Sequence, residues 1–130
     1  MNATLVKWSL TAALALAALP ALAAEPLPAC KDLPQNVRTM IRDFDACART
    51  ADPAKACLRF KLNARAYDNA QGLLPPLGGI GAQYWRASPA LLGSPQGLVY
   101  NLAVGAKGKP ISKRYYTGDN FKAFCEIAGK

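Results

Sequence analysis

The chain contains no histidine, and this absence restricts the chemistry that its side chains can perform. Serine and cysteine triads use imidazole as a proton acceptor, and most catalytic zinc sites use it as a ligand. The remaining metal-binding candidates are four cysteines without a C-x-x-C pair, namely Cys30, Cys47, Cys57 and Cys125. Their spacing argues against a structural zinc site. We therefore expect neither a metal nor a cofactor.

A strong excess of cations points to an anionic partner. Lysine and arginine together number 16 against 8 acidic residues, which gives a formal net charge of +8 over 130 residues. Such a balance is typical of proteins that bind nucleic acid or an anionic membrane surface.

Two short clusters combine a cation with an aromatic side chain. Arg86 follows Trp85, and the pair Lys113-Arg114 precedes Tyr115. Such surfaces bind single-stranded nucleic acids because the cations contact phosphates while bases stack on the aromatic rings. The alternative is that these residues are solvated charges at strand edges, with Arg86 stacked on an exposed Trp85.

Residues 1–24 have the organisation of a secretory signal peptide. Lys7 supplies a positive charge, an uncharged apolar run follows over residues 8–22, and Ala23-Ala24 offers small residues for cleavage. This pattern predicts cleavage near Ala23-Ala24 and a secreted or periplasmic protein. The apolar run is short for a membrane anchor. We therefore expect residues 25–130 to form a single domain without a membrane span.

Apolar residues at helical spacing predict a helix over about residues 33–49. Asp32 is placed to cap its N-terminus. The apolar face of this helix contains Val37, Met40, Ile41, Phe44 and Cys47. The pair Asp52-Pro53 repeats the capping pattern and predicts a second, shorter helix through Cys57 and Phe60.

The pattern then changes from helical spacing to short strands. Residues 68–82 are rich in glycine and proline and predict a loop, with a short strand near Leu73 and Leu74. Four further strands, separated by turns, are predicted at Gln83–Ser88, Gly97–Val104, Ser112–Tyr116 and Phe121–Ile127. Helices followed by such strands predict an α+β fold, with the N-terminal helices packed on an antiparallel β-sheet.

Three segments carry a family resemblance. Residues 30–34 read CKDLP, residues 67–75 read YDNAQGLLP, and residues 115–124 read YYTGDNFKAF. In this order they resemble the C-x-x-L-P opening, the guanine-binding loop and the Y-Y-T-G-D-H-Y-x-T-F segment of the secreted guanyl-specific ribonucleases of bacteria. The third segment is the most specific. The resemblance implies a microbial ribonuclease-like fold and RNA as the substrate class.

The resemblance also implies catalytic positions, and this chain holds different residues at all of them. The histidine of the family corresponds to Asn120, and the glutamate base falls at Ala87, or at Arg86 in an alternative register. Gly93 and Gly97 fall at the positions of two phosphate-binding arginines. Because RNA cleavage needs a base, an acid and cations on the phosphate, we expect weak or absent endoribonuclease activity.

Other residues could take over part of the family's function. The predicted catalytic substitutes, which would act by electrostatic stabilisation, are Arg86, Lys113, Arg114 and Tyr115. The resemblance assigns nucleotide binding to Tyr67, Asn69, Gln71 and Phe121. In this loop Gln71 replaces the glutamate that reads the guanine edge, so the charge-assisted pair of bonds is lost. Asn69 and Tyr67 have a structural alternative, in which the asparagine holds the tight loop and the tyrosine packs it.

The resemblance also selects one of the three disulfide pairings that four cysteines allow. Exported proteins generally pair their cysteines. Family members tie their N-terminal cysteine to their last segment, which implies a Cys30–Cys125 disulfide. The other pair, Cys47–Cys57, would then flank the turn between the two helices at Asp52-Pro53.

We interpret the chain as a secreted ribonuclease-family protein that binds RNA or nucleotides, a pseudoenzyme or a weak endonuclease. We expect it to be a monomer whose main partner is single-stranded RNA. The alternative hypothesis is a protein-interaction module or a secreted toxin. In that case the same fold would engage a protein partner, such as an inhibitor or an immunity protein.

Overall fold

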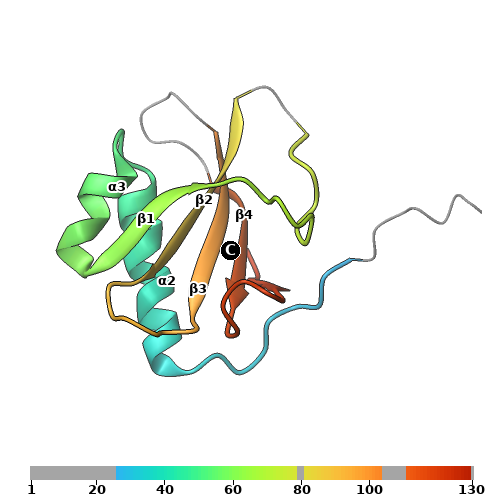
Figure 1. Ribbon diagram of the computed structural model, residues 1–130, viewed down its shortest axis with the longest axis horizontal. Helices are drawn as coiled ribbons and strands as arrows, with labels where there is room; N and C mark the ends of the chain where they lie inside the picture. The colour runs from blue at the N-terminus through green and yellow to red at the C-terminus, as the bar shows by residue number, and fades with distance from the viewer. Residues whose placement is uncertain (1–25, 79–80, 104–110, 130) are drawn as a thin grey trace, which may run out of the picture.

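A five-stranded antiparallel sheet lies at the centre of the structure, and its strands are neighbours in chain order (Figure 1). The computed structural model describes residues 26–78, 81–103 and 111–129. The strands are β1 (Leu62–Tyr67), β2 (Ala82–Pro89), β3 (Gly97–Ala103), β4 (Ile111–Thr117) and β5 (Cys125–Glu126). Every strand therefore pairs with the strand that follows it, as in a β-meander.

The helical elements precede the sheet in the chain. They are α2 (Gln35–Ala48), α3 (Pro53–Ala56) and the 3-10 helix η2 (Cys57–Phe60). The predicted α+β class, with helices first and an antiparallel sheet afterwards, is confirmed. The predicted signal peptide, residues 1–24, lies outside the described residues, as do Val104 and the predicted turn at residues 105–110. None of the described helices is long and apolar enough to cross a membrane.

Helix α2 follows its predicted range, but its N-terminus differs from the prediction. Pro34 occupies the N-cap position and makes no capping hydrogen bond through its side chain. Asp32, the predicted cap, instead adopts a left-handed backbone with φ of 49°. The first turn is held by Arg38, whose guanidinium donates to the carbonyl oxygen of Leu33 at 2.6 Å. The predicted cap of the second helix is confirmed, because Asp52 accepts from a backbone N–H of α3.

The sheet differs from the prediction at both edges. Strand β1 was not predicted, and the strand predicted near Leu73 and Leu74 is absent from the described loop. The last predicted strand, residues 121–127, is reduced to Cys125–Glu126. Its first half cannot be extended because the backbone of Phe121 has a positive φ of 63°, which forces a turn.

Side chains on the two faces of the sheet form two separate apolar cores. One core lies between the sheet and α2, where the Phe44 ring packs 4.4 Å from that of Tyr100, measured between centroids. The other covers the opposite face and contains Leu74, Tyr84, Val99, Tyr115 and Phe124. Because side chains alternate along a strand, adjacent residues such as Val99 and Tyr100 enter different cores. We call these surfaces the helix face and the loop face of the sheet.

Both predicted disulfides are present. Cys47–Cys57 joins α2 to η2, and Cys30–Cys125 joins the segment before α2 to β5. The N-terminal segment also pairs with β5 through its backbone, since Cys30 N–H donates to the Glu126 carbonyl oxygen at 2.9 Å. The two ends of the described domain are therefore tied together, and the loop face is completed by residues close to the C-terminus.

Candidate functional site

A groove of about 600 Å³ opens on the loop face of the sheet. Its walls come from the loop after β1, the loop between β2 and β3, and the loop after β4. The side chains that carry its polar and aromatic character are Tyr67, Gln71, Arg86, Asn120, Phe121 and Lys122. Three of the four predicted nucleotide-binding residues, Tyr67, Gln71 and Phe121, therefore line one groove together with the predicted substitute Arg86.

The Arg86 side chain forms the floor of the groove. Its guanidinium carbon lies 3.8 Å from the centroid of the Phe121 ring, which is a close cation–π contact. No ion pair to Arg86 is found in the part of the chain that the structure describes. Burial lowers the pKa of this guanidinium, and neighbouring Arg65 lowers it further. Arginine nevertheless stays protonated in proteins, so the groove holds a cation that can accept an anionic partner.

The loop that presents Phe121 is built around one buried hydroxyl group. Thr117 is 1% exposed, and its Oγ1 accepts from the backbone N–H groups of Asp119 and Phe121, each at 3.2 Å. The same hydroxyl donates to Asp119 Oδ1 at 2.8 Å. These bonds hold Asn120 and Phe121 in consecutive left-handed conformations, each with φ of 63°. Such strain is uncommon for a bulky residue and is typical of functional loops.

Asp119 makes this loop sensitive to acid. The hydrogen bond from Thr117 is the largest cause that lowers the pKa of the Asp119 carboxyl, and backbone N–H donors lower it further. A carboxyl whose pKa is lowered by folding stabilises the native state above its unfolded pKa. That contribution is lost as the pH falls through the folded pKa. The loop is therefore held in place at neutral and mildly acidic pH.

Gly97 lies directly beside the Phe121 ring. A Cβ atom at this position would overlap that ring, so only glycine lets the ring approach the backbone of β3 so closely. The resemblance places a lost arginine at Gly97, but its role here is to make room for an aromatic residue of the groove. Gly93, the other such position, lines the groove and has a positive φ of 82°.

We expect Gly97→Ala to destabilise the fold by about 1–3 kcal/mol, because the added methyl group displaces the Phe121 ring. In a Phe121→Ala background the same substitution should be neutral or slightly stabilising, since alanine is favoured over glycine within a strand. Urea unfolding of the two single variants and the double variant measures this coupling. If Gly97→Ala lowers the free energy of unfolding equally in both backgrounds, the packing role assigned to Gly97 is contradicted.

The loop after β1 is held by Asn69, as its structural alternative predicts. The Asn69 side chain donates to the Leu74 carbonyl oxygen at 2.8 Å and accepts from the Leu74 N–H at 3.1 Å. Its own φ is 53°. The nucleotide-binding role predicted for Asn69 has no geometric support, because both ends of its amide are engaged within the loop. This bracing instead positions Tyr67 and Gln71 at the groove wall.

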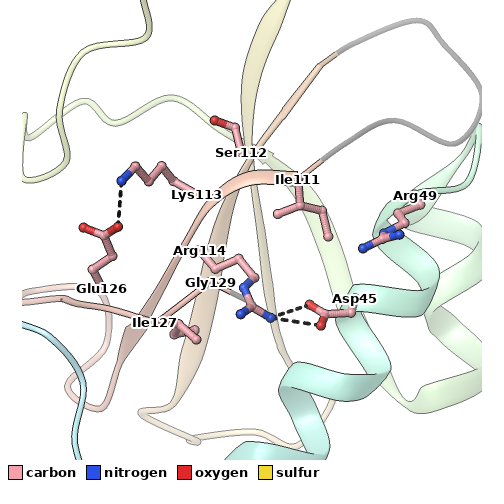
Figure 2. Close-up of a pocket in the computed structure, with 9 residues that line it drawn as sticks. All are labelled: Asp45, Arg49, Ile111, Ser112, Lys113, Arg114, Glu126, Ile127 and Gly129. Carbon is pink, nitrogen blue, oxygen red and sulfur yellow. Dashed lines mark hydrogen bonds and ion pairs between the residues drawn. The ribbon is translucent and has the colours of Figure 1, made fainter.

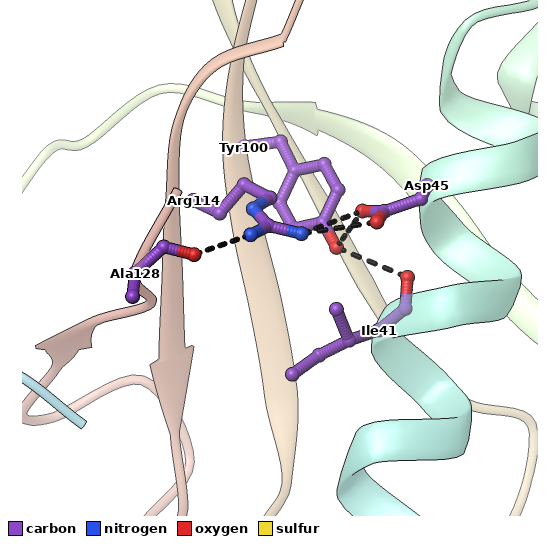
Figure 3. A network of polar contacts seen from close by, with 5 residues as sticks. All are labelled: Ile41, Asp45, Tyr100, Arg114 and Ala128. Atoms are coloured by element: carbon purple, nitrogen blue, oxygen red, sulfur yellow. Dashed lines mark hydrogen bonds and ion pairs between the residues drawn. The ribbon is translucent and has the colours of Figure 1, made fainter. Parts of the chain in front are cut away.

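Arg114, a predicted catalytic substitute, does not line the groove. Its side chain lies on the helix face, where Nη1 donates to Asp45 Oδ2 at 3.0 Å and Nη2 donates to the Ala128 carbonyl oxygen at 2.6 Å (Figure 3). The Tyr100 hydroxyl donates to the same aspartate at 2.6 Å, and burial is the main cause that raises its pKa. This network joins β3 and β4 to α2, so Arg114 is structural.

Lys113 and Tyr115 are also outside the groove. Lys113 forms an ion pair with Glu126 at 2.9 Å and borders a second pocket, of about 390 Å³, beside Arg114 (Figure 2). Tyr115 is 3% exposed and packs on Tyr84 in the core of the loop face. Of the four predicted catalytic substitutes, only Arg86 lines the groove. Strand alternation turns Arg114 to the helix face, whereas Lys113 lies beyond the groove lining and is paired with Glu126.

Strand alternation also decides which residue near Arg86 faces the groove. Ala87 is fully buried in the core against α2, so its side chain cannot reach the groove. Of the two residues that the resemblance offers for the position of the base, Arg86 is the one whose side chain lines the groove. Lys122 is a groove residue that sequence reasoning missed, although it follows Phe121 directly within the most specific of the three motifs.

Comparisons of the chain with family models, with curated proteins and with solved structures each find no match. Across residues 26–78, 81–103 and 111–129, no group of three cysteine, aspartate or glutamate side chains gathers to hold a metal ion. The chemistry of the groove therefore has to be argued from its own residues, whose polar and aromatic members are one arginine, one lysine, one aspartate, two aromatic rings, three amides and two serines.

Proposed function

We propose that the protein binds single-stranded RNA or nucleotides in the groove of the loop face, as an exported relative of the guanyl-specific ribonucleases with weak or absent cleavage. The observation that carries this proposal is the Arg86 guanidinium on the Phe121 ring, beside Tyr67 and Lys122. Cations for phosphates and rings for bases are the two components that single-strand binding requires.

The family assignment is supported by the three sequence motifs and by the place of two of them in the fold. The loop at residues 67–75 and the segment 115–124 are far apart in the chain, yet both contribute walls of the same groove. The two disulfides support export, because such bonds persist mainly in oxidising compartments.

The expected mode of binding follows from the order of side chains along the groove. A base would stack at Tyr67 and Phe121, whose ring centroids are 6.1 Å apart, while Arg86 and Lys122 would meet backbone phosphates. The amide of Gln71 can accept one hydrogen bond from a base edge but lacks the charge of a carboxylate. Preference for guanine should therefore be slight.

We expect Arg86→Gln to lower the affinity for a labelled oligoribonucleotide by about tenfold and Phe121→Ala by about five- to hundredfold, since loss of a stacked base costs roughly 1–3 kcal/mol. Two phosphate contacts predict a slope of about −1.4 in a plot of log affinity against log salt. Arg86→Gln or Lys122→Gln should each reduce that slope by about 0.7. Fluorescence anisotropy over a salt series measures both quantities.

Two variants with the same change of charge serve as controls. Lys55 is exposed on α3 and Lys113 is paired with Glu126, so Lys55→Gln and Lys113→Gln should leave the slope nearly unchanged. If the Lys113 variant reduces affinity as much as the Arg86 variant does, binding is diffuse over the surface. The groove is then not the RNA site, and a protein partner becomes the better hypothesis.

A further inference from the structure

The two most exposed large apolar side chains in the described part of the chain are neighbours on one loop. Leu91 is 71% exposed and Leu92 is 102% exposed, both in the connection between β2 and β3 (Figure 1). We call residues 90–96 the leucine loop. Two adjacent leucines that are both largely exposed to water on one loop indicate a surface that is covered by something else.

The leucine loop is held in this exposed position at both ends. Ala90 N–H donates to the Lys61 carbonyl oxygen at 2.9 Å, and the Pro95 carbonyl oxygen accepts from Asn120 N–H at 2.8 Å. The positive φ of Gly93 turns the chain back between these anchors. The leucines therefore project at the tip of a braced turn.

Cations surround the exposed leucines. Lys61 is exposed and bonds the base of the leucine loop through its backbone, while Lys122 and Arg86 line the groove that Leu91 and Leu92 also border. Asp68 is the only carboxylate among the residues that line this groove, and it lies on the wall formed by the loop after β1. The leucine loop thus combines two exposed apolar side chains with neighbouring cations.

We propose that the leucine loop docks the protein on an anionic lipid surface. Leu91 and Leu92 enter the boundary between headgroups and acyl chains, while the exposed side chains of Lys61 and Lys122 meet the lipid phosphates. This arrangement combines the two contributions that hold interfacial proteins on membranes, namely buried apolar area and attraction to anionic headgroups. The proposal goes beyond RNA binding and does not depend on it.

A lipid surface suits this tip better than a folded protein partner does. A specific protein interface buries about 800 Å² on each side, with shape complementarity across the patch. Two side chains on a projecting turn fall far below that area. A fluid bilayer interface accepts a small apolar tip without a matching shape, and binding of this size is weak and reversible.

The test uses the exported chain, residues 25–130, which contains every described element, and vesicles of phosphatidylcholine with or without phosphatidylglycerol. We expect cosedimentation with the anionic vesicles, and Leu91→Ser/Leu92→Ser should reduce the partition coefficient at least about tenfold. Lys61→Gln should reduce it about fivefold on anionic vesicles. A matched control, Leu73→Ser/Leu77→Ser, removes two leucines that are 36% and 37% exposed outside the leucine loop and should leave binding unchanged.

Two outcomes would overturn the proposal. If Leu91→Ser/Leu92→Ser binds anionic vesicles as well as the unmodified protein does, adsorption is due to net charge alone. If the unmodified protein does not bind vesicles but the same double variant binds RNA more weakly, the leucines form an apolar lip of the RNA groove. The affinity of the same variants for the oligoribonucleotide is measured in parallel. Loss of RNA binding in Arg86→Gln supports the proposed function whether or not the protein binds vesicles, so failure of the lipid proposal is distinguished from failure of the RNA proposal.

Discussion

Residues 25–130, the chain that would remain after removal of the predicted signal peptide, are expected to cleave guanylyl dinucleotides at least about ten-thousandfold more slowly than the bacterial guanyl-specific ribonucleases. A general acid and a general base each contribute about 10²- to 10⁴-fold to such reactions, and the two positions that the resemblance gives to them hold other residues here. Asn120 takes the place of the acid and cannot supply a proton near neutral pH. Arg86 faces the groove at the position of the base, and a guanidinium cannot accept a proton there.

The other groove residues do not restore this chemistry. Burial raises the pKa of the Tyr67 hydroxyl, so tyrosinate is scarce at neutral pH. Asp68 is the one carboxylate that lines the groove, and its Oδ1 accepts the Ala70 N–H at 3.0 Å, which engages it in the loop. What remains is electrostatic stabilisation of the phosphate by Arg86 and Lys122, which does not replace the two proton transfers that the reaction needs.

The measurement is turnover of labelled RNA and of GpN dinucleotides across a range of pH, with Arg86→Gln prepared in parallel to detect a contaminating nuclease. Residual activity should show no titration near pH 6.5, because the chain has no histidine. Rapid turnover by the unmodified protein that disappears in Asp68→Asn would contradict the assignment, and it would identify Asp68 as a catalytic base.

Local patterns were sufficient to predict much of this fold. The apolar spacing of α2 and the capping by Asp52 are decided within a few residues of sequence, and both are found in the structure. Three of the four later strands, at β2, β3 and β4, also lie where alternation and turn residues predict them. Strand β1 is missed because two of its four apolar residues are alanines, which give little strand signal between Leu62 and Tyr67.

The candidate site could be predicted only in part, because its geometry depends on which face of the sheet each residue occupies. Arg86 and Arg114 look equivalent in sequence, since each is a cation beside an aromatic residue. In the sheet, the first points into the groove and the second is bonded to Asp45 of α2. A shift of one residue along a strand reverses its face, so only the register of the pairing could separate them.

The same limit applies to the loop after β4. Residues 117–120 are predicted as a turn and Phe121 as the start of a strand. Backbone N–H groups that donate to Thr117 and Asp119 instead carry the strained turn through Phe121. Such bonds compete with strand pairing and leave no periodic trace in the sequence. Periodicity places Phe121 at the start of a strand. The motif resemblance instead assigns Phe121 to nucleotide binding, and its ring does line the groove.

Removing the Cys30–Cys125 disulfide is expected to cost about 4–5 kcal/mol of unfolding free energy by the chain-entropy argument, because the bond closes a long loop. The two cysteines are separated by 95 positions, against 10 for Cys47–Cys57, for which the same argument gives only about 3 kcal/mol. A domain of this size has about 5–15 kcal/mol in total, so the first loss removes a large part of its stability.

The position of the bond adds a local effect that the loop length does not include. Strand β5 has only two residues and pairs with Tyr115 and Tyr116 of β4, while the segment before α2 pairs with its other side. Removing the Cys30–Cys125 disulfide should therefore weaken the pairing of β5 before that of the other strands. Phe124, which packs in the core of the loop face just before β5, then loses its support, and the adjoining ring of Phe121 moves with it.

Urea unfolding of Cys30→Ala/Cys125→Ala and of Cys47→Ala/Cys57→Ala separates these contributions, with the midpoint and the slope m both recorded. The first variant should be the less stable, and at temperatures where it is still folded it should bind RNA more weakly, because the Phe121 wall of the groove is released. The second should keep RNA affinity, since Cys47 and Cys57 lie in the core on the helix face. If the Cys47–Cys57 variant is the less stable of the two, the cavity left in that buried core outweighs chain entropy, and the tie between the ends of the domain is not what maintains the groove.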